Sequence, residues 1–144
     1  MVASSEGIAL REAIELLYFG YRAFTAHPDR ILKTQGLGRV HHRILYFIGR
    51  HPYITIHGLL KILGVSKQAL HRPLRDLLVA GLVTERTALH DRRMRELTLS
   101  PQGLALETQL TMVQTDYLDA VFTAVGPEAE AAWRLVMQKM TELP

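Results

Sequence analysis

Five polar side chains recur at helical spacing in the middle of the chain, and together they have the chemistry of a surface that reads nucleic acid. If residues 66 onward form a helix, one stripe of it contains Lys67, Gln68, His71, Arg72 and Arg75. Glutamine can pair with adenine through two hydrogen bonds, and arginine can pair with guanine in the same way. Ser66 and Lys67 stand at the helix start, where they can hold a phosphate against the positive end of the helix dipole. The stripe therefore predicts a helix that enters the major groove of DNA.

The distribution of charge favours this interpretation over a simpler one, in which the stripe is only a solvated helix face. Residues 61–95 contain eight Lys or Arg and three Asp or Glu, a net charge of +5. Residues 96–144 contain two basic and seven acidic side chains, a net charge of −5, and the whole chain carries +3. Because concentrated positive charge commonly neutralises phosphates, we expect the middle of the chain to bind a polyanion.

A second basic group follows at residues 90–93, between two segments that read as strands. We assign His90, Arg92 and Arg93 to DNA contacts, and Arg93 in particular to a narrow minor groove, where the negative potential is enhanced. Phosphate would repel Asp91 if its side chain pointed outward. We therefore expect Asp91 to shape the loop, by accepting backbone hydrogen bonds or by pairing with a neighbouring arginine.

The segments that must position these residues form a helix-turn-helix. Thr55 can cap a short helix that runs to Leu63, Gly64 supplies a left-handed residue that closes it, and Ser66 begins the next helix. Pro73 falls inside that helix, where we expect a kink or a loosened turn. The small core of the motif is expected to contain Leu59, Leu60, Leu63, Val65, Leu70, Leu74 and Leu77, with Ala69 and Leu78 on the same side.

The remaining segments predict a hairpin and longer helices on both sides. Residues 82–86 and 94–99 read as two strands of a wing, and Ser100 and Pro101 predict the start of a long helix. Apolar periodicity predicts helices over residues 8–24 and 40–48, with Ser5 as a cap, Pro28 ending the first helix and a loop over residues 28–38. A last helix is expected after Gly126 and Pro127.

These segments predict a mainly α (α+β) fold, a winged helix-turn-helix with long N- and C-terminal dimerisation helices. A chain of 144 residues is expected to form a single domain, residues 1–144. We assign residues 1–36 and 101–144 to a helical dimerisation region and residues 37–100 to a winged helix-turn-helix DNA-binding lobe. One small core cannot bury the apolar stripes of three terminal helices, so we expect these helices to intertwine with a second copy.

Other chemistries find little support in the sequence. The chain has no cysteine, which excludes disulfides, cysteine nucleophiles and thiolate metal sites. It has no phosphate-cradling glycine loop, nucleophile elbow or paired carboxylates, so we expect no enzyme activity and no cofactor. The adjacent His41 and His42 face different directions on a helix, and we expect no metal site. With neither a membrane span nor a secretory signal in the pattern, a cytoplasmic protein is expected.

The run from residue 56 to residue 103 resembles the MarR family of bacterial transcription regulators. Its most specific part is HDRRMRELTLSPQG, which is similar to the family's wing signature through Asp91, Arg93 and Gly103. The resemblance implies a triangular homodimer on a pseudo-palindromic, double-stranded DNA operator, with half-sites about one helical turn apart. It also implies repression that is often relieved by a small ligand, commonly a phenolic or aromatic acid.

In this family such ligands usually bind between the helical interface and the winged lobe. The residues that this arrangement would bring there are Tyr18, Tyr21, Arg22, His41, His42 and Arg43. Arg22 or Arg43 could hold a carboxylate; alternatively, the aromatic side chains are interface packing and the arginines are solvated or paired. An alternative function also remains open, in which the winged helix contacts protein, or nucleic acid without sequence preference.

Overall fold

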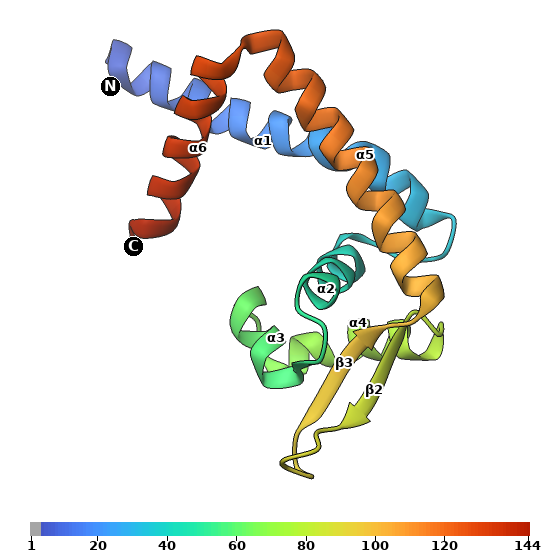
Figure 1. Cartoon of the computed structure of the whole chain (residues 1–144). Coiled ribbons are helices and arrows are strands. Elements are labelled where there is room, and N and C mark those ends of the chain that lie inside the picture. Colours follow the sequence, from blue (N-terminus) through green and yellow to red (C-terminus); the bar gives the residue numbers. More distant parts are fainter. Residues whose placement is uncertain (1–3) are drawn as a thin grey trace.

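A computed structural model describes residues 4–144 and divides them into six helices and three strands (Figure 1). The first three residues of the expected helical region, 1–3, lie outside the described residues. No helix in residues 4–144 is long and apolar enough to cross a membrane. In chain order the elements are α1 (Ser5–Lys33), α2 (Arg39–Arg50), β1 (Ile54–Thr55), α3 (Ile56–Leu63), α4 (Lys67–Val79), β2 (Val83–Thr87), β3 (Arg95–Leu99), α5 (Pro101–Val125) and α6 (Pro127–Glu142).

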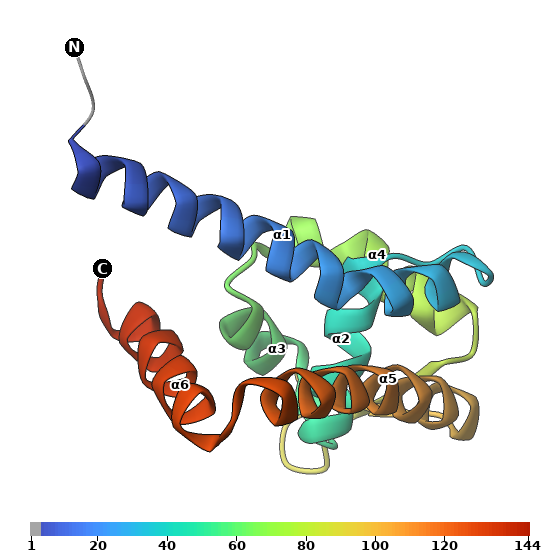
Figure 2. The same ribbon diagram turned by 90° about the horizontal axis from the view of Figure 1, so that it is seen from above.

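The elements form a lobe below two long helices, which confirms the predicted fold class. Helices α2, α3 and α4 and the small sheet make up the lobe, while α1 and α5 cross above it (Figure 1). Seen from above, α2 lies between α1 and α5, and it packs against both (Figure 2). The first half of α1 and the whole of α6 project away from the lobe as two arms (Figure 2).

The prediction that Pro28 ends the first helix is wrong. Helix α1 continues through Pro28 to Lys33 and is capped by Ser4, whose Oγ accepts a hydrogen bond from the Gly7 N–H at 3.0 Å. Pro28 and Leu32 are both buried, so packing against the lobe holds the last turns of the helix despite the missing backbone donor. The predicted loop is correspondingly short, running only from residue 34 to residue 38.

Local capping explains the helix-turn-helix, as the sequence predicted. The Thr55 hydroxyl caps α3, Gly64 closes it with φ of 64°, and the Ser66 hydroxyl accepts a hydrogen bond from the Ala69 N–H at 3.1 Å at the start of α4. Helix α4 runs unbroken through Pro73 to Val79. The turn between the two helices is thus only three residues long.

The wing is an antiparallel hairpin with one strand more than predicted. Strands β2 and β3 pair from Val83 with Leu99 to Thr87 with Arg95, within one residue of the expected bounds. The two-residue strand β1 pairs with the other edge of β3, giving the order β1-β3-β2. Through β1 the wing is attached directly to the start of α3.

A close approach joins the wing to α5. The backbone N–H of Ser100 donates to the Leu82 carbonyl at 3.0 Å, and the Ser100 hydroxyl donates to the Gly81 carbonyl at 2.6 Å. The same hydroxyl caps α5 by accepting from the Gly103 N–H. A Cβ atom at Gly103 would lie 1.8 Å from the Leu82 carbonyl oxygen, so only glycine fits there.

The core lies inside the lobe and under the near ends of the long helices. Most of the expected helix-turn-helix core is buried or packed against it, but Val65 and Ala69 are exposed, contrary to the prediction. Helix α6 has no buried residue, and α1 buries only Thr25, Pro28 and Leu32. The largest fully buried side chains are Pro28, Leu32, Ile44, Leu45, Ile48, Leu59, Leu77, Leu97 and Leu110.

Candidate nucleic-acid interface

The polar stripe of α4 lies entirely on the surface. Leu70, Leu74 and Leu77 face the core of the lobe. The five side chains expected to read DNA, and the capping serine, are exposed on the helix: Ser66, Lys67, Gln68, His71, Arg72 and Arg75. The structure therefore separates α4 into an apolar face that holds the helix and a basic face that is free to enter a groove.

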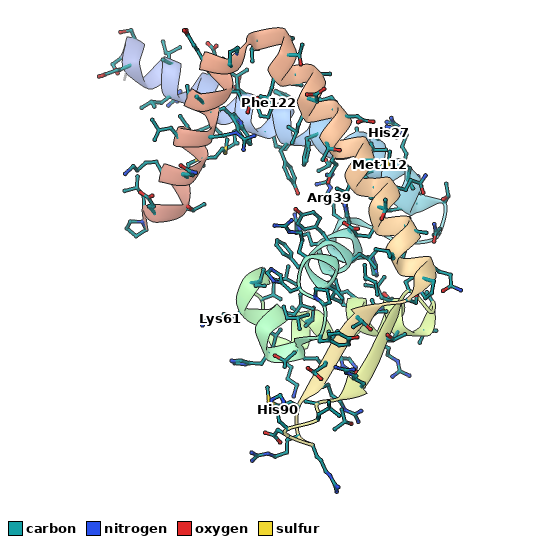
Figure 3. All side chains as sticks on the ribbon, in the orientation of Figure 1. His27, Arg39, Lys61, His90, Met112 and Phe122 are labelled. Carbon is teal, nitrogen blue, oxygen red and sulfur yellow. The ribbon has the colours of Figure 1, made fainter. Side chains whose placement is uncertain are left out.

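The tip of the wing carries the second basic group. His90 lies at the far end of the hairpin (Figure 3), and His90, Arg92 and Arg93 are all exposed. The side chain of Arg93 is 90% exposed, yet its guanidinium group contacts both carboxylate oxygens of Asp91, at 3.2 and 3.3 Å. The basic tip is thus both accessible and shaped by one internal ion pair.

Asp91 organises the loop between the strands. Its Oδ1 also accepts a hydrogen bond from the Arg93 backbone N–H at 3.0 Å, and its carbonyl accepts one from the Met94 N–H at 3.1 Å. The hydrogen bond from the Arg93 side chain, followed by the one from the Arg93 backbone, lowers the pKa of Asp91. The carboxylate is therefore ionised at neutral pH, and the geometry is the loop-shaping one that the sequence suggested.

Sequence reasoning missed two basic residues between the wing and the helix-turn-helix. His57, near the start of α3, and Arg95, on β3, line a hollow together with Lys67 and Arg93. Nη1 of Arg95 also lies 3.6 Å from Oε1 of Glu85. No local pattern brings them together, because they come from segments almost 40 residues apart; only the pairing of β1 with β3 does so.

Another basic residue of the sheet is turned away from this hollow. The guanidinium carbon of Arg86 lies 3.8 Å from the centre of the Tyr53 ring, and its Nε donates to Glu96 at 3.3 Å. Tyr53 has a backbone φ of 67°, a conformation that residues other than glycine rarely adopt. Arg86 therefore links β2 to Glu96 of β3 and to Tyr53, and it does not line the hollow.

A separate cavity of about 360 Å³ lies where α1, α2 and α5 meet. Of the six residues expected to bind a ligand, Tyr21, His42 and Arg43 line this cavity, whereas Tyr18, Arg22 and His41 do not. The structure adds residues from α5 and Arg39, which Figure 3 shows between the long helices and α2. The lining is Tyr21, Phe24, Thr25, Arg39, His42, Arg43, Tyr46, Phe47, Thr111, Gln114, Thr115 and Leu118.

The cavity combines aromatic rings with cations. Nη2 of Arg43 donates a hydrogen bond to the Tyr21 hydroxyl at 2.7 Å. The guanidinium carbon of Arg39 lies 5.5 Å from the centre of the Tyr21 ring, and Nη2 of Arg39 pairs with Oδ2 of Asp29 at 2.9 Å. His42 is buried, and among residues 4–144 its ring makes no hydrogen bond. Burial lowers the pKa of His42, and the charges of Glu107 and Asp29 only partly oppose that shift. His42 is therefore a neutral polar group at the cavity wall.

His41 points the other way, toward α4. Its Nδ1 accepts a hydrogen bond from the Gly38 N–H at 3.0 Å, and its Nε2 lies 2.9 Å from Oδ2 of Asp76. The expectation that His41 and His42 face different directions is met, and His41 cannot serve the cavity. Within the described part of the chain, no group of three or more histidine or acidic side chains is placed to hold a metal ion.

Solved structures share this arrangement. FabT of Streptococcus pneumoniae, in complex with DNA, superimposes with a TM-score of 0.83 at 15% identity, over 92% of this chain and 95% of FabT. MarR of Staphylococcus aureus, in complex with salicylate and kanamycin, superimposes with a TM-score of 0.78 at 21% identity, over 94% of this chain and 91% of that one. At these identities the two structures show a common fold.

Sequence comparison identifies the family. Residues 35–94 match the family model described as the MarR family. The chain is 44% identical over 133 residues to the HTH-type transcriptional regulator PetP of Rhodobacter capsulatus. The aligned residues cover 92% of this chain and 80% of PetP. An identity of this size over nearly the whole chain, together with the family model and the exposed basic face of α4, confirms the resemblance: the chain belongs to the MarR family of winged-helix, DNA-binding transcriptional regulators.

Proposed function

We propose that this regulator binds a pseudo-palindromic operator as a homodimer and selects it by sequence. The observation that carries the proposal is the composition of the exposed face of α4, where Gln68 and Arg72 can pair with base edges. Lys67 is placed to contact phosphate at the helix start, and the wing offers Arg92 and Arg93 to the adjacent groove. FabT, which has the same fold, is seen in complex with DNA, and this supports the placement of the two basic groups on a duplex.

The two projecting arms support the homodimer. The first half of α1 exposes Ile8, Leu10, Ile14, Leu16 and Leu17, and α6 exposes Trp133, Leu135, Val136 and Met140. Apolar surfaces of this extent are rarely left open to water in a stable soluble protein. A second copy that covers both arms would place two lobes side by side, so that two α4 helices face successive turns of one duplex.

The cavity between α1, α2 and α5 supports a ligand-responsive repressor. A phenolic or aromatic acid of small size fits its chemistry, because Tyr21 and Phe24 offer aromatic faces and Arg39 and Arg43 offer positive charge. The salicylate complex of Staphylococcus aureus MarR supports this class of ligand. Titration with salicylate and related acids tests it: a ligand should raise the melting temperature and weaken operator binding, and Arg43→Ala should reduce both effects.

The proposal is tested by binding to a pool of random duplexes, with enriched sequences determined at two salt concentrations and the mass of the protein measured in parallel. A sequence-selective dimer should enrich an inverted repeat with half-site centres about 10 base pairs apart. Salt-sensitive binding that enriches no sequence would instead indicate non-specific nucleic-acid association. Absence of binding would indicate a module that contacts protein.

A further inference from the structure

His41 connects the start of α2 to the middle of the DNA-facing helix. Because its Nδ1 accepts the Gly38 N–H, that nitrogen carries no proton, and the proton of the neutral ring lies on Nε2. Nε2 therefore donates to Oδ2 of Asp76 at 2.9 Å. One imidazole ring thus caps α2 and holds a carboxylate of α4 at the same time.

Asp76 occupies an unexpected position for an acidic side chain. It comes four residues, or one helical turn, after Arg72, so it lies beside one of the cations expected to meet DNA. A negative charge here repels phosphate and weakens binding to any duplex. The Asp76 side chain is 48% exposed and the His41 side chain is 12% exposed, so water screens the pair in part and its contribution to stability is modest. General affinity for DNA does not account for this residue.

The link to His41 has a geometric consequence. Within residues 4–144 it is the only side-chain hydrogen bond between α4 and another helix. The buried side chains of Leu70, Leu74 and Leu77 also hold α4 against the lobe, through apolar contacts that have no directional preference. A hydrogen bond is satisfied only over a narrow range of distance and angle. The contact between His41 and Asp76 therefore adds a directional constraint on the rotation of α4 about its axis.

We propose that Asp76, held by His41, is a positioning residue for sequence selection. It fixes the direction in which Gln68 and Arg72 point, at the cost of some attraction to the DNA backbone. The inference rests on the proposed selection of an operator by sequence. Its expected signature is a change in the ratio of the dissociation constants for random and operator duplexes, since a mere change in charge moves both constants together.

Three variants separate positioning from charge. Asp76→Ala removes both the charge and the hydrogen bond, whereas Asp76→Asn removes the charge and keeps an oxygen that can accept from His41 Nε2. His41→Asn keeps an oxygen at the place of Nδ1 to cap Gly38 and removes the atom that reaches Asp76, with no change in the charge of α4. Dissociation constants for operator and random duplexes are measured at one salt concentration, and a thermal melt of each variant confirms that it is folded.

We expect Asp76→Asn to keep the ratio within about twofold and to tighten binding to both duplexes. Asp76→Ala and His41→Asn should lower the ratio roughly three- to tenfold, the factor that corresponds to one ordinary hydrogen bond. If Asp76→Ala tightens binding to both duplexes by the same factor, or if His41→Asn leaves the ratio unchanged, Asp76 acts only through its charge and the inference is wrong. If the unaltered protein itself enriches no operator, the proposed function fails first.

Discussion

At the scale of single residues, Asp91 shows how one carboxylate can set the shape of a loop. It accepts hydrogen bonds from the backbone and the side chain of Arg93, and these hold the pKa of Asp91 below the ordinary aspartate value. A group whose pKa is lowered by folding contributes stability above its unfolded pKa and loses it as the pH falls through the folded pKa. The wing conformation should therefore persist at mildly acidic pH.

An NMR titration checks this expectation. The backbone amide resonance of Arg93 should shift as Asp91 becomes protonated, and the midpoint of that transition should lie below the ordinary aspartate pKa. In the Asp91→Asn variant the same resonance should lack this transition. A transition at or above the ordinary aspartate pKa would show that Arg93 does not hold the carboxylate in solution.

Replacing Gly103 by alanine should destabilise the protein, although alanine forms helices more readily than glycine does. In most helices, replacing glycine by alanine stabilises by up to about 1 kcal/mol. Here the added Cβ would lie 1.8 Å from the Leu82 carbonyl oxygen, so the wing or α5 must shift. Gly103→Ala should lower the free energy of unfolding by about 1–3 kcal/mol or more. Denaturation by urea at a fixed protein concentration measures the free energy of unfolding. As a control, Gln102→Ala, at the exposed neighbouring position, should change that free energy by no more than about 0.5 kcal/mol.

At the scale of elements, the proposed function assigns some α4 side chains to phosphate contacts and others to base contacts. Lys67→Ala should weaken binding to operator and random duplexes alike and should reduce the slope of log Kd against log salt by about one, because one phosphate contact is lost. Gln68→Ala should cost about 1–3 kcal/mol on the operator alone, with the loss concentrated at one base pair. Binding of both variants to operator and random duplexes, measured at several salt concentrations, separates a phosphate contact from a base contact. If each variant weakens binding to the two duplexes equally, the assignment of Gln68 to a base is wrong.

The helix-turn-helix and the wing could be predicted because their signals are local. Caps at Thr55, Ser66 and Ser100 and the left-handed Gly64 act within four residues of the positions they mark, and the structure confirms each of them. Pro28 was predicted wrongly because local rules describe its missing donor but not its burial against the lobe. Strand β1 escaped prediction because two residues carry no periodicity and their partner on β3 is distant in sequence.

The candidate sites divide in the same way. The exposed polar face of α4 follows from helical spacing, so sequence alone predicts it, and its role in reading DNA stays a prediction. The lining of the cavity between α1, α2 and α5 could be predicted only in part. Tyr21, His42 and Arg43 come from neighbouring helices, whereas Thr111 and Gln114 belong to α5, which follows the whole lobe in the sequence. His41 was assigned to the cavity because adjacent residues share a segment, although on a helix they face different neighbours.

At the scale of the whole molecule, the apolar surface is the unbalanced feature. The lobe has a closed core, whereas the arms present apolar side chains from α1 and α6 that no part of residues 4–144 covers. A lobe that reads one half-site needs a partner lobe at a fixed distance to read a palindrome. The arms are the elements that can supply both the association and that distance.

A charged substitution in the arm should therefore separate dimerisation from folding. Ile14 and Leu17 are exposed on α1, far from the core of the lobe, so Ile14→Glu combined with Leu17→Glu should leave the lobe folded while placing two charges in the proposed interface. We expect sedimentation equilibrium to show a monomer at micromolar concentration, and operator affinity to fall far more than affinity for an isolated half-site. Leu89→Glu, at the exposed tip of the wing, is the matched control and should remain a dimer. If the doubly charged variant sediments as the unaltered protein does, α1 is not part of the interface, and the distance between the two reading helices must be set by other elements.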